Sequence, residues 1–443
     1  MQRKILLFGA GKSASYLIDF FVQQENYLLS MVDPAGEQVL NRYPGNERLQ
    51  LLEVNINESA QVLEAMKQHD LVISMLPAAM HPLIARYCLQ AEKSLFTASY
   101  VSEEMRSLDA EAKSKGLLFM NEVGLDPGID HMSALLLLDT LRKDGAKITG
   151  FYSYTGGLIA PESDTNPWHY KFTWNPRNVV LAAQGGLAQL KENGRYRFLS
   201  YNQVFRQIKQ FDLGDWGRFE GYANRDSLAY RSLYGLEDAE TMIRGTLRGE
   251  HFCSGWDFLV QLGLTENHTV IHFDQEPGAA EFLESFLPGH GSMQEKIQTY
   301  LGDNTTNSLM SQLAQLGLYD NQYRFKRKSG TPAEFLQELL EDKWKLEAHD
   351  KDMIVMLHRV NYHLNGKTRT VESRLRVIGH DQTFTAMAQT VGLPLAYAAE
   401  AYLNGAYHAS GVHVPNDPAL YAYILQRLSS DGIVFEEHEI SHL

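Results

Sequence analysis

Cysteine is scarce in this sequence: Cys88 and Cys253 are the only two among 443 residues. Two cysteines cannot form a disulfide framework or a cysteine-rich zinc site, and so low a thiol content fits a reducing compartment. Long apolar runs are also missing, because no stretch reaches 18 residues and the run Ile5–Phe8 is too short for a secretory signal. These absences predict a cytoplasmic protein that does not contact a membrane.

Basic residues are outnumbered as well: 40 Lys and Arg residues face 54 Asp and Glu residues, so the formal net charge is −14. Nucleic-acid binding needs a basic stripe, and nucleic acid is therefore not expected as a partner. The 16 histidines show no HExxH or comparable ligand spacing, and no metal site is expected. The 44% of hydrophobic residues suffice for the cores of about two or three domains.

A strand–helix period fills the first 120 residues. Short apolar segments, about two dozen residues apart, begin at Lys4, Leu28, Leu51, Leu71, Ser94 and Leu117. Helix-like stretches lie between them at 13–24, 59–67, 82–91 and 103–115. Strands that are apolar on both faces are typical of a parallel sheet covered by helices on each side. The pattern predicts an α/β fold with a Rossmann-type doubly wound parallel sheet.

The first strand–helix turn predicts a dinucleotide site. Residues 9–14 read G-x-G-x-x-A, in which the first glycine permits a tight turn, the second lets the backbone approach a pyrophosphate, and the small last residue lets the helix pack closely. The helix N-terminus then offers N–H groups to the phosphates. The residues expected to bind the cofactor here are Gly9, Ala10, Gly11, Lys12 and Ser13.

Asp33 ends the second apolar segment, 19 residues after Ala14. An acidic side chain at that place accepts hydrogen bonds from the adenosine ribose and would repel a 2′-phosphate. No arginine follows directly, since the next one is Arg42. The sequence therefore favours NAD over NADP, although Asp33 before Pro34 also fits an ordinary turn residue.

A polar turn follows the sixth apolar segment, at residues 121–131 (NEVGLDPGIDH). Ligands of open α/β sheets bind beyond the carboxyl ends of the strands, so this turn is expected to face the cofactor. Asp126, Asp130 and His131 could support acid–base chemistry there. The alternative is that Asp126 caps the turn and that His131 is a buried, hydrogen-bonded histidine.

Residues 121–132 closely resemble the signature of the glutamate-forming saccharopine dehydrogenases, a family that includes fungal saccharopine reductases and the dehydrogenase half of the bifunctional lysine-degradation enzyme. The resemblance runs from about residue 4 to residue 435. Further matching segments lie at 97–101 (TASYV), 153–157 (SYTGG), 160–162 (APE), 166–167 (NP), 170–174 (YKFTW), 221–227 (GYANRDS), 244–248 (RGTLR), 351–356 (KDMIVM) and 386–394 (AMAQTVGLP).

This resemblance implies an oxidoreductase that acts on a CH–NH group. The implied reaction is the NAD-dependent oxidative deamination of saccharopine to L-glutamate and 2-aminoadipate 6-semialdehyde, in lysine degradation, by a homodimer. Three alternatives stay open: an NADP-dependent saccharopine reductase of lysine biosynthesis, a reductase similar to carboxynorspermidine synthase, and a dinucleotide-binding protein without turnover.

The resemblance also assigns roles to residues. Saccharopine carries three carboxylates, and arginines bind carboxylates through their planar forks. Asp126 and Tyr100 are the expected catalytic residues. The expected substrate-binding residues are Ser99, Tyr100, Asp126, Thr155, Arg225, Arg244, Gly245 and Thr246. The further cofactor-binding residues, beside Asp33, are Val54, Asn55, Leu76, Ala98, Ser99, Val123, Gly124, Leu125 and Asn175.

Two positions qualify these roles. Thr155 stands where the family often has cysteine, and a hydroxyl cannot act as a thiolate near neutral pH, so the chemistry is expected to proceed without a thiol. Arg248 carries less weight than Arg225 and Arg244, because a structural ion pair explains it equally well.

The remainder of the chain is expected to hold an α+β substrate and dimerisation domain with a helical insert. A strand over Ile148–Tyr154 precedes an irregular, aromatic-rich stretch to about Gly221, and amphipathic helices follow from 278 to about 348. Residues 353–364 and 367–378 flank Asn365-Gly366, which predicts a hairpin. Ala386–Leu403 is expected to be a helix that returns to the dinucleotide domain, and the basic run 324–328 to be a solvated linker.

The predicted domain limits follow from this reading. The dinucleotide-binding domain is expected at 1–125 and to be completed by 386–443. The substrate domain is expected at 126–275 and 350–385, with the helical subdomain at 276–349.

Overall fold

The computed structural model describes residues 2–302 and 306–440, so the last three residues of the predicted range 386–443 lie outside it. The chain forms two compact units. Among the described residues, unit 1 contains those up to Lys147 together with Ser373–His438, and unit 2 contains those within Ile148–Glu372 together with Glu439 and Ile440. In the described parts of the chain, no helix is both long enough and apolar enough to cross a bilayer.

Unit 1 is built on a parallel sheet. Its seven strands within the described residues lie in the order β17-β6-β5-β4-β1-β2-β3 and all run parallel. The bounds are β1 (Arg3–Phe8), β2 (Tyr27–Val32), β3 (Leu49–Leu51), β4 (Leu71–Ser74), β5 (Ser94–Thr97), β6 (Leu118–Met120) and β17 (Gly411–His413). The chain adds β2 and β3 on one side of β1 and then β4, β5 and β6 on the other. Sheets of this kind bind ligands at the point between β1 and β4 where this order reverses. The predicted Rossmann-type sheet is confirmed.

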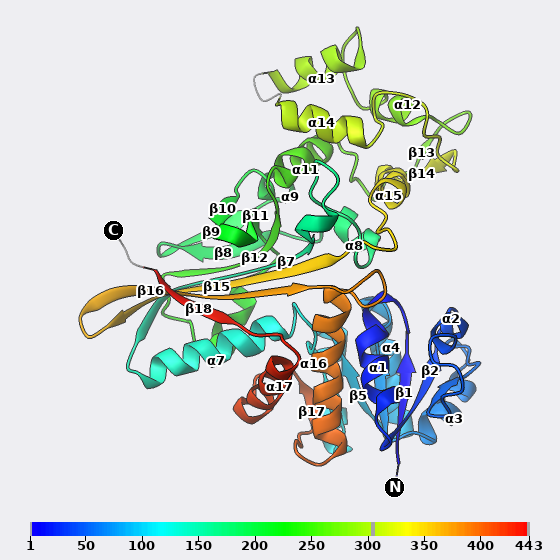
Figure 1. Cartoon of the computed structure of the whole chain (residues 1–443), viewed down its shortest axis with the longest axis vertical. Helices are drawn as coiled ribbons and strands as arrows, with labels where there is room; N and C mark the ends of the chain where they lie inside the picture. The colour runs from blue at the N-terminus through cyan, green and yellow to red at the C-terminus, as the bar shows by residue number, and fades with distance from the viewer. Residues whose placement is uncertain (1, 303–305, 441–443) are drawn as a thin grey trace. The chain divides into compact units, whose positions relative to one another are not determined.

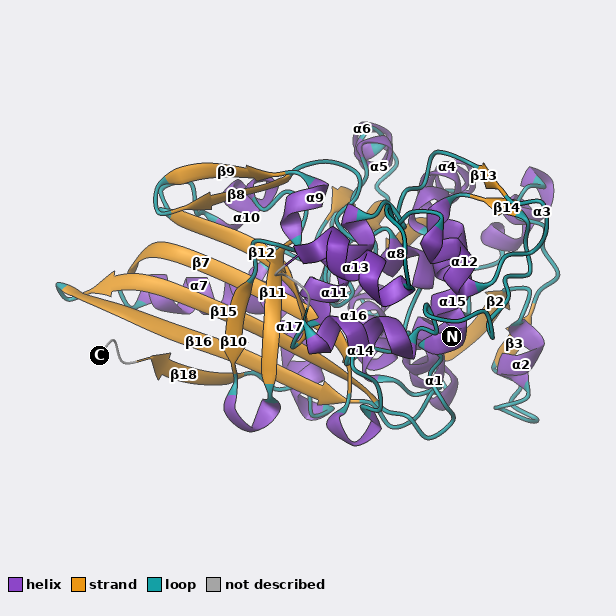
Figure 2. Ribbon diagram, turned by 90° about the horizontal axis from the view of Figure 1, so that it is seen from above, coloured by secondary structure: helices purple, strands orange, loops and turns teal. Residues whose placement is uncertain are grey.

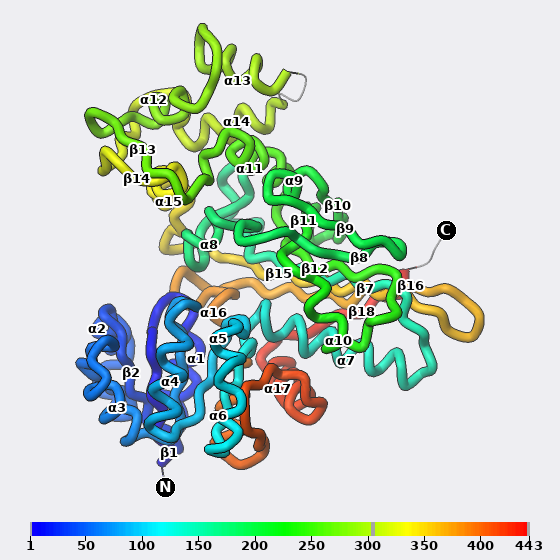
Figure 3. Tube along the Cα trace, turned by 180° about the vertical axis from the view of Figure 1, so that it is seen from behind, coloured from blue at the N-terminus to red at the C-terminus, as the bar shows by residue number. Residues whose placement is uncertain are grey.

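Helices cover both faces of this sheet, which explains its nearly continuous apolar strands. On one face α1 (Ser15–Gln23) packs against α16 (Ala386–Leu403), and on the other α3 (Ser59–Lys67) packs against α4 (His81–Ala91) (Figures 1 and 3). The small residues of α16 permit its close approach, because a Cβ on Gly392 would lie 2.9 Å from the backbone nitrogen of Leu17. The predicted helix over Ala386–Leu403 is therefore confirmed, together with its packing onto the dinucleotide-binding fold.

The other helices of unit 1 lie at α2 (Gly36–Leu40), α5 (Glu103–Arg106), α6 (Asp109–Ser114), α7 (Ile129–Lys143) and α17 (Pro418–Ser430). The prediction of a single helix over 103–115 is wrong, because the helical conformation is interrupted between α5 and α6. Ser102 caps α5 by accepting the Met105 N–H at 3.1 Å, so this short helix has its own start.

Unit 2 contains most of a mixed sheet in the order β10-β11-β12-β7-β15-β16-β18, with β8 pairing both β12 and β9, and the border between the units falls within β16 (Figure 2). The strand bounds are β7 (Lys147–Ile159), β8 (Ala188–Glu192), β9 (Arg195–Leu199), β10 (Lys209–Asp212), β11 (Arg218–Ala223), β12 (Thr241–Gly249), β15 (Asp352–Leu364), β16 (Lys367–Ile378) and β18 (Glu436–Ile440). The hairpin at Asn365-Gly366 is confirmed, with φ angles of 52° and 74°.

The prediction of an irregular stretch up to Gly221 is wrong, because these residues form β8, β9 and β10. Asn193 and Gly194 join β8 to β9 with φ angles of 49° and 77°, the same turn chemistry as at Asn365-Gly366. In β9, Tyr196 and Phe198 are exposed and alternate with arginines, so this strand has no apolar run to reveal it.

The expected helical segments of unit 2 are present. The helices are α8 (Pro176–Val180), α9 (Tyr201–Val204), α10 (Arg231–Tyr234), α11 (Phe252–Gln261), α12 (Ala279–Glu284), α13 (Met293–Leu301), α14 (Asn307–Gln315) and α15 (Pro332–Lys343), with a short pair of strands at β13 (Ile271–His272) and β14 (Ser329–Gly330). Their Leu and Phe residues are buried in one core with the aromatic residues of the sheet, as expected for packing helices.

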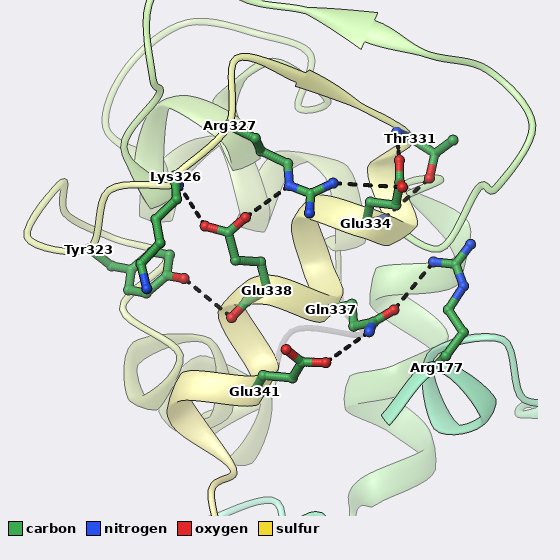
Figure 4. Close-up of polar contacts among 9 residues, drawn as sticks. All are labelled: Arg177, Tyr323, Lys326, Arg327, Thr331, Glu334, Gln337, Glu338 and Glu341. Carbon is green, nitrogen blue, oxygen red and sulfur yellow. Dashed lines mark hydrogen bonds and ion pairs between the residues drawn. The ribbon is translucent and has the colours of Figure 1, made fainter. Parts of the chain in front are cut away.

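Of the basic run 324–328, Arg324, Lys326 and Lys328 are exposed as predicted, but the segment is not a free linker. Phe325 is buried, and the Arg327 Nε donates to Glu338 Oε2 of α15 at 2.9 Å (Figure 4). The Lys326 backbone N–H donates to the other oxygen of the same carboxylate at 2.6 Å. This segment is therefore fixed on α15 through the Arg327 side chain and the Lys326 backbone.

Candidate active site

The glycine turn after β1 leaves room for a dinucleotide. Gly9 has a φ of +88°, and a Cβ there would lie 2.9 Å from the carbonyl carbon and oxygen of Met75, so only glycine fits. A Cβ on Gly11, in contrast, would meet no atom within 4 Å. Open space beside Gly11, followed by the helical turn Lys12–Ala14, fits the approach of a pyrophosphate to the backbone N–H groups.

Asp33 is occupied by the backbone of the same region. Its Oδ2 accepts the N–H of Ala10 at 2.7 Å, and its Oδ1 accepts the N–H of Ala35 at 2.7 Å. Each carboxylate oxygen thus joins the glycine turn or the turn after β2. A ribose hydroxyl would have to compete with these bonds, so the presence of Asp33 does not by itself select a cofactor.

The carboxyl ends of β4, β5 and β6 gather several predicted residues. The Glu122 N–H donates to the Ser99 carbonyl at 3.1 Å, and the Val123 N–H donates to the Thr97 carbonyl at 3.3 Å. A Cβ on Gly124 would lie 2.9 Å from the Cβ of Ala98, so a glycine is required there. The structure therefore brings Ala98, Ser99, Val123 and Gly124 together.

The other predicted cofactor residues are more dispersed. Leu76 adjoins Gly9, because a Cβ on Gly9 would lie 3.1 Å from the Leu76 nitrogen. Leu125, within the polar turn, is buried. Val54 and Asn55 lie after β3, and no hydrogen bond joins them to the other predicted residues in the described ranges. Asn175 belongs to unit 2, where its side chain caps α8 by accepting the Arg177 N–H at 3.0 Å.

Tyr100 and Asp126, the two expected catalytic residues, are in direct contact. The Tyr100 hydroxyl donates to Asp126 Oδ1 at 2.6 Å, and both side chains are half-buried. Such a short bond to a carboxylate is among the stronger hydrogen bonds in proteins. The pair can hold a carboxylate in place for proton transfer while leaving it accessible to a ligand.

The polar turn around Asp126 is held by buried polar side chains. Glu122 accepts the Val101 N–H at 2.9 Å through Oε1, and its Oε2 lies 2.9 Å from the Nε2 of His131. Asp130 accepts the Gly128 N–H at 2.7 Å. His131 and Asp130 are both only 1% exposed. Of the two interpretations of His131, the structure supports the buried, hydrogen-bonded histidine, and Asp130 likewise stabilises the turn.

One residue at this edge, His81, was not predicted from the sequence. The Nδ1 of His81 lies 2.9 Å from Ser74 Oγ, and its Nε2 lies 2.8 Å from Ser99 Oγ. No local motif contains His81, but its place in the first turn of the helix after β4 is a signal that could have found it. Burial lowers the pKa of His81 to about 4, so the ring is neutral at neutral pH.

In unit 2, one face of β12 carries the expected substrate residues. Arg244, Thr246 and Arg248 are every second residue of the strand and therefore lie on one face of it. Thr246 is in register with Thr155 of β7. Arg244 is 7% exposed, and its guanidinium carbon lies 4.3 Å from the ring centroid of Tyr230. The Thr155 hydroxyl is buried without a hydrogen-bond partner among the described residues, so it is available to a ligand.

Two further expected residues are placed differently. A Cβ on Gly245 would lie 2.2 Å from a ring carbon of Tyr154, so Gly245 is explained by packing of the sheet. Arg225 follows β11, is exposed and has a φ of 48°, while its carbonyl accepts the Gln189 N–H at 2.9 Å. Its side chain therefore differs from that of Arg244 in being open to solvent.

Arg248 is a buried cation in an aromatic cage. It is 4% exposed, and its guanidinium carbon lies 5.2 to 5.9 Å from the ring centroids of Tyr170, Phe252 and Tyr222. Its Nη1 donates to the Leu247 carbonyl at 3.1 Å, but its Nε has no partner and no ion pair joins it to a carboxylate within residues 2–302 and 306–440. Among the described residues, Arg248 therefore lacks the structural ion pair that the sequence allowed for.

The fold and the glycine turn define a Rossmann-type dinucleotide-binding protein. Residues 5–120 match the family described as saccharopine dehydrogenase NADP binding domain, and residues 124–433 match the saccharopine dehydrogenase C-terminal domain. The chain belongs to the saccharopine dehydrogenase family of oxidoreductases, whose named members act in lysine metabolism.

Relatives and solved structures agree with this assignment. The chain is 30% identical to the saccharopine dehydrogenase [NADP(+), L-glutamate-forming] of Saccharomyces cerevisiae, over 100% of both chains. It is also 30% identical to the mitochondrial alpha-aminoadipic semialdehyde synthase of Mus musculus, covering 98% of this chain and 47% of that protein. The apo structure of the Saccharomyces cerevisiae saccharopine dehydrogenase (L-Glu forming) superposes with a TM-score of 0.89 at 28% identity, over 99% of this chain and 100% of that chain.

The expectation of NAD is wrong. The matching domain family is an NADP-binding one, and the relatives from Saccharomyces cerevisiae and Schizosaccharomyces pombe are named as NADP(+)-dependent. The argument failed because it treated the Asp33 carboxylate as free for the ribose. Both of its oxygens instead bind backbone N–H groups.

Proposed function

We propose that this chain is an NADP(H)-dependent, L-glutamate-forming saccharopine dehydrogenase. It interconverts saccharopine, water and NADP(+) with L-glutamate, 2-aminoadipate 6-semialdehyde, NADPH and a proton. The observation that carries this proposal is the buried cationic face of β12, with Arg244 and Arg248, in a chain of net charge −14. Buried guanidinium groups in an acidic protein match a substrate that carries three carboxylates.

The residues of unit 1 supply the acid–base part of the reaction. NADP(+), when bound, supplies the hydride acceptor. Saccharopine loses the hydride from the lysine-side carbon and a proton from the shared nitrogen, and the imine then takes up water and splits into the aldehyde and the amine of glutamate. Asp126 is the group that accepts the proton, and Tyr100 holds its carboxylate through the 2.6 Å bond.

The residues of unit 2 bind the substrate. Arg244 holds a carboxylate, and the hydroxyls of Thr155 and Thr246 offer further hydrogen bonds on the same face of the sheet. Neither cysteine takes part: Cys88 and Cys253 are both fully buried, and burial raises the pKa of each thiol. The reaction therefore proceeds without a thiolate.

Steady-state kinetics with purified protein test this proposal. The expected result is NADPH formation from saccharopine and NADP(+) at alkaline pH. Oxidation releases a proton, and a low proton concentration therefore favours it. Absence of turnover with saccharopine, combined with reductive coupling of a diamine to a semialdehyde, would establish the carboxynorspermidine synthase-like alternative instead. NADPH binding without turnover of either substrate would identify a non-catalytic dinucleotide-binding protein.

The oligomeric state is part of the same proposal. Most soluble oligomers are symmetric, with twofold dimers the commonest, and we propose a homodimer here. Light scattering on the purified protein checks this directly, because a mass near 50.2 kDa would show a monomer and refute it.

A further inference from the structure

A row of hydrogen-bonded side chains crosses the carboxyl ends of β4 and β5. Ser74 and Thr97 end these strands in register with each other, and His81 opens α4 above them. The row runs from Ser74 Oγ through the His81 ring to Ser99 Oγ, with contacts of 2.9 and 2.8 Å. Thr97 Oγ1 lies 3.2 Å from the same Nε2 and accepts the Ser99 N–H at 3.3 Å.

Burial changes steadily along this row. Ser74 is 0% exposed and His81 is 3% exposed, whereas Ser99 is half-buried at the open end. The inner end is closed, so the row has no outlet to solvent and cannot conduct protons through the protein. Its remaining role is to orient the outer hydroxyl.

The hydrogen-bond network assigns the tautomer of His81. Ser74 has no other side-chain partner in the part of the chain that the structure describes, and a buried hydroxyl that only accepted would leave its own proton unsatisfied. Ser74 therefore donates to Nδ1, and the proton of the neutral ring lies on Nε2. The nearer acceptor of that proton is Ser99 Oγ.

We propose that His81 is a positioning residue that acts through Ser99. Its Nε2–H holds the Ser99 oxygen, so that the Ser99 O–H is left to donate to a carbonyl or carboxylate oxygen of the bound ligand. This inference rests on the proposed function, because it assumes a ligand at the carboxyl edge of the sheet. It adds a residue outside the polar turn and the glycine turn to the machinery of unit 1.

Two variants of the same histidine separate positioning from packing. A glutamine side chain places its amide near the Nε2 position and can still reach Ser99, whereas an asparagine amide lies near the Nδ1 position and reaches only Ser74. His81→Asn is expected to lose on the order of tenfold in kcat/KM or in NADPH affinity, the effect of one lost hydrogen bond, and His81→Gln much less.

A matched control is available in the same unit. His69 is also buried, with Nδ1 at 2.7 Å from the Ala65 carbonyl and Nε2 at 2.8 Å from Ser30 Oγ. Burial lowers its pKa too, but it lies away from Ser99, between α3 and β2. His69→Asn is expected to lower stability without changing NADPH affinity or kcat/KM.

The closing experiment is a double-mutant cycle of His81→Asn and Ser99→Ala, read by NADPH fluorescence titration and by kcat/KM for saccharopine. The expected result is that His81→Asn has no further effect once Ser99 is alanine. Additive losses, or equal behaviour of His81→Asn and His81→Gln in both measurements, would overturn the inference.

The remaining outcomes are also decisive. If His81→Asn does not fold, Ser74→Ala removes the support of the ring from the inner side, and its smaller loss must likewise vanish in the Ser99→Ala background. If the wild-type protein does not oxidise saccharopine, the proposed function fails, while the NADPH titration still decides the role of His81.

Discussion

The carboxyl edge of the unit 1 sheet and the β12 face of unit 2 differ in how their buried polar groups are partnered. At the edge, the serine, histidine and carboxylate side chains around Ser99 and Asp126 hold one another through bonds of 2.6 to 2.9 Å. On β12, Arg248 keeps its charge among aromatic rings, and no carboxylate among the described residues pairs with it.

This difference shows how the two regions are prepared for ligands. A hydrogen-bonded edge is organised before anything binds, which suits residues that must orient reacting groups. A buried guanidinium without a counter-ion costs folding energy, and an anionic ligand lowers that cost. In the proposed function, the first region orients the reacting groups and the second attracts the carboxylates of the substrate.

The largest expected contrast lies between two buried cations of unit 2. Lys171 Nζ pairs with Asp350 Oδ2 at 2.7 Å, with side chains 8% and 13% exposed. Lys171→Met leaves this carboxylate without its cation and should lower the free energy of unfolding by about 3–5 kcal/mol. Arg248→Met removes a charge that has no such partner and should change it by less than about 1 kcal/mol.

Urea unfolding of both variants measures this contrast. Arg248→Met should also weaken saccharopine binding, because the field of a poorly screened charge extends along β12 to Arg244. Equal destabilisation of the two variants would show that Arg248 is paired within the fold, and the contrast between the two regions would then disappear.

Arg244→Met tests the cationic face by activity. Removing a buried guanidinium that binds a carboxylate should cost about 2–5 kcal/mol in kcat/KM for saccharopine, while the Kd of NADPH stays unchanged. Arg197→Met is the control, because the Arg197 side chain on β9 is 45% exposed. Similar losses in both variants would argue against a substrate site at Arg244.

Asp126→Asn tests the organised edge. If the carboxylate accepts the substrate proton, its loss should lower kcat roughly a hundredfold, near the lower end of acid–base effects. Tyr100→Phe should lower kcat less, because it only frees the carboxylate from its 2.6 Å bond. An unchanged kcat in Asp126→Asn would assign the proton transfer to another group or to water.

The smallest effect concerns pH. The pKa of buried His81 lies near 4, below its ordinary value of about 6.5, so the unfolded chain binds more protons between these values. Stability contributed by the neutral ring is complete above pH 6.5 and falls as the pH drops toward 4, by about 2 kcal/mol at pH 5. His81→Gln should reduce this slope.

Equal slopes for the wild type and His81→Gln in urea unfolding at pH 7 and pH 5 would contradict the neutral ring. Because His69 is buried in a similar way and has a lowered pKa, His69→Asn should reduce the slope as well. That result would separate a general property of buried histidines from the specific role of His81.

Much of unit 1 could be predicted from the sequence, for a physical reason. Parallel strands covered on both faces are continuously apolar, and the glycine turn after β1 has a strict steric origin at Gly9. In unit 2 the same reasoning found the hairpin at Asn365-Gly366 but missed the one at Asn193-Gly194. Strand β9 carries charged and aromatic residues on exposed positions, so its period is hidden.

The site was harder to predict because its contacts are long-range. Tyr100 and Asp126 are 26 positions apart, and only the adjacent ends of β5 and β6 bring them together. His81 reaches Ser99 only because β4 and β5 end in register. Asp33 was placed correctly at the end of β2, but which hydrogen bonds its oxygens accept could not be known before the backbone was seen.

The most direct test of the central claim is a product analysis of one reaction mixture. Purified protein, saccharopine and NADP(+) should yield NADPH and L-glutamate in equal amounts, and Arg244→Met should reduce both together. Formation of NADPH with lysine and 2-oxoglutarate in place of glutamate, or no glutamate at all, would contradict the account.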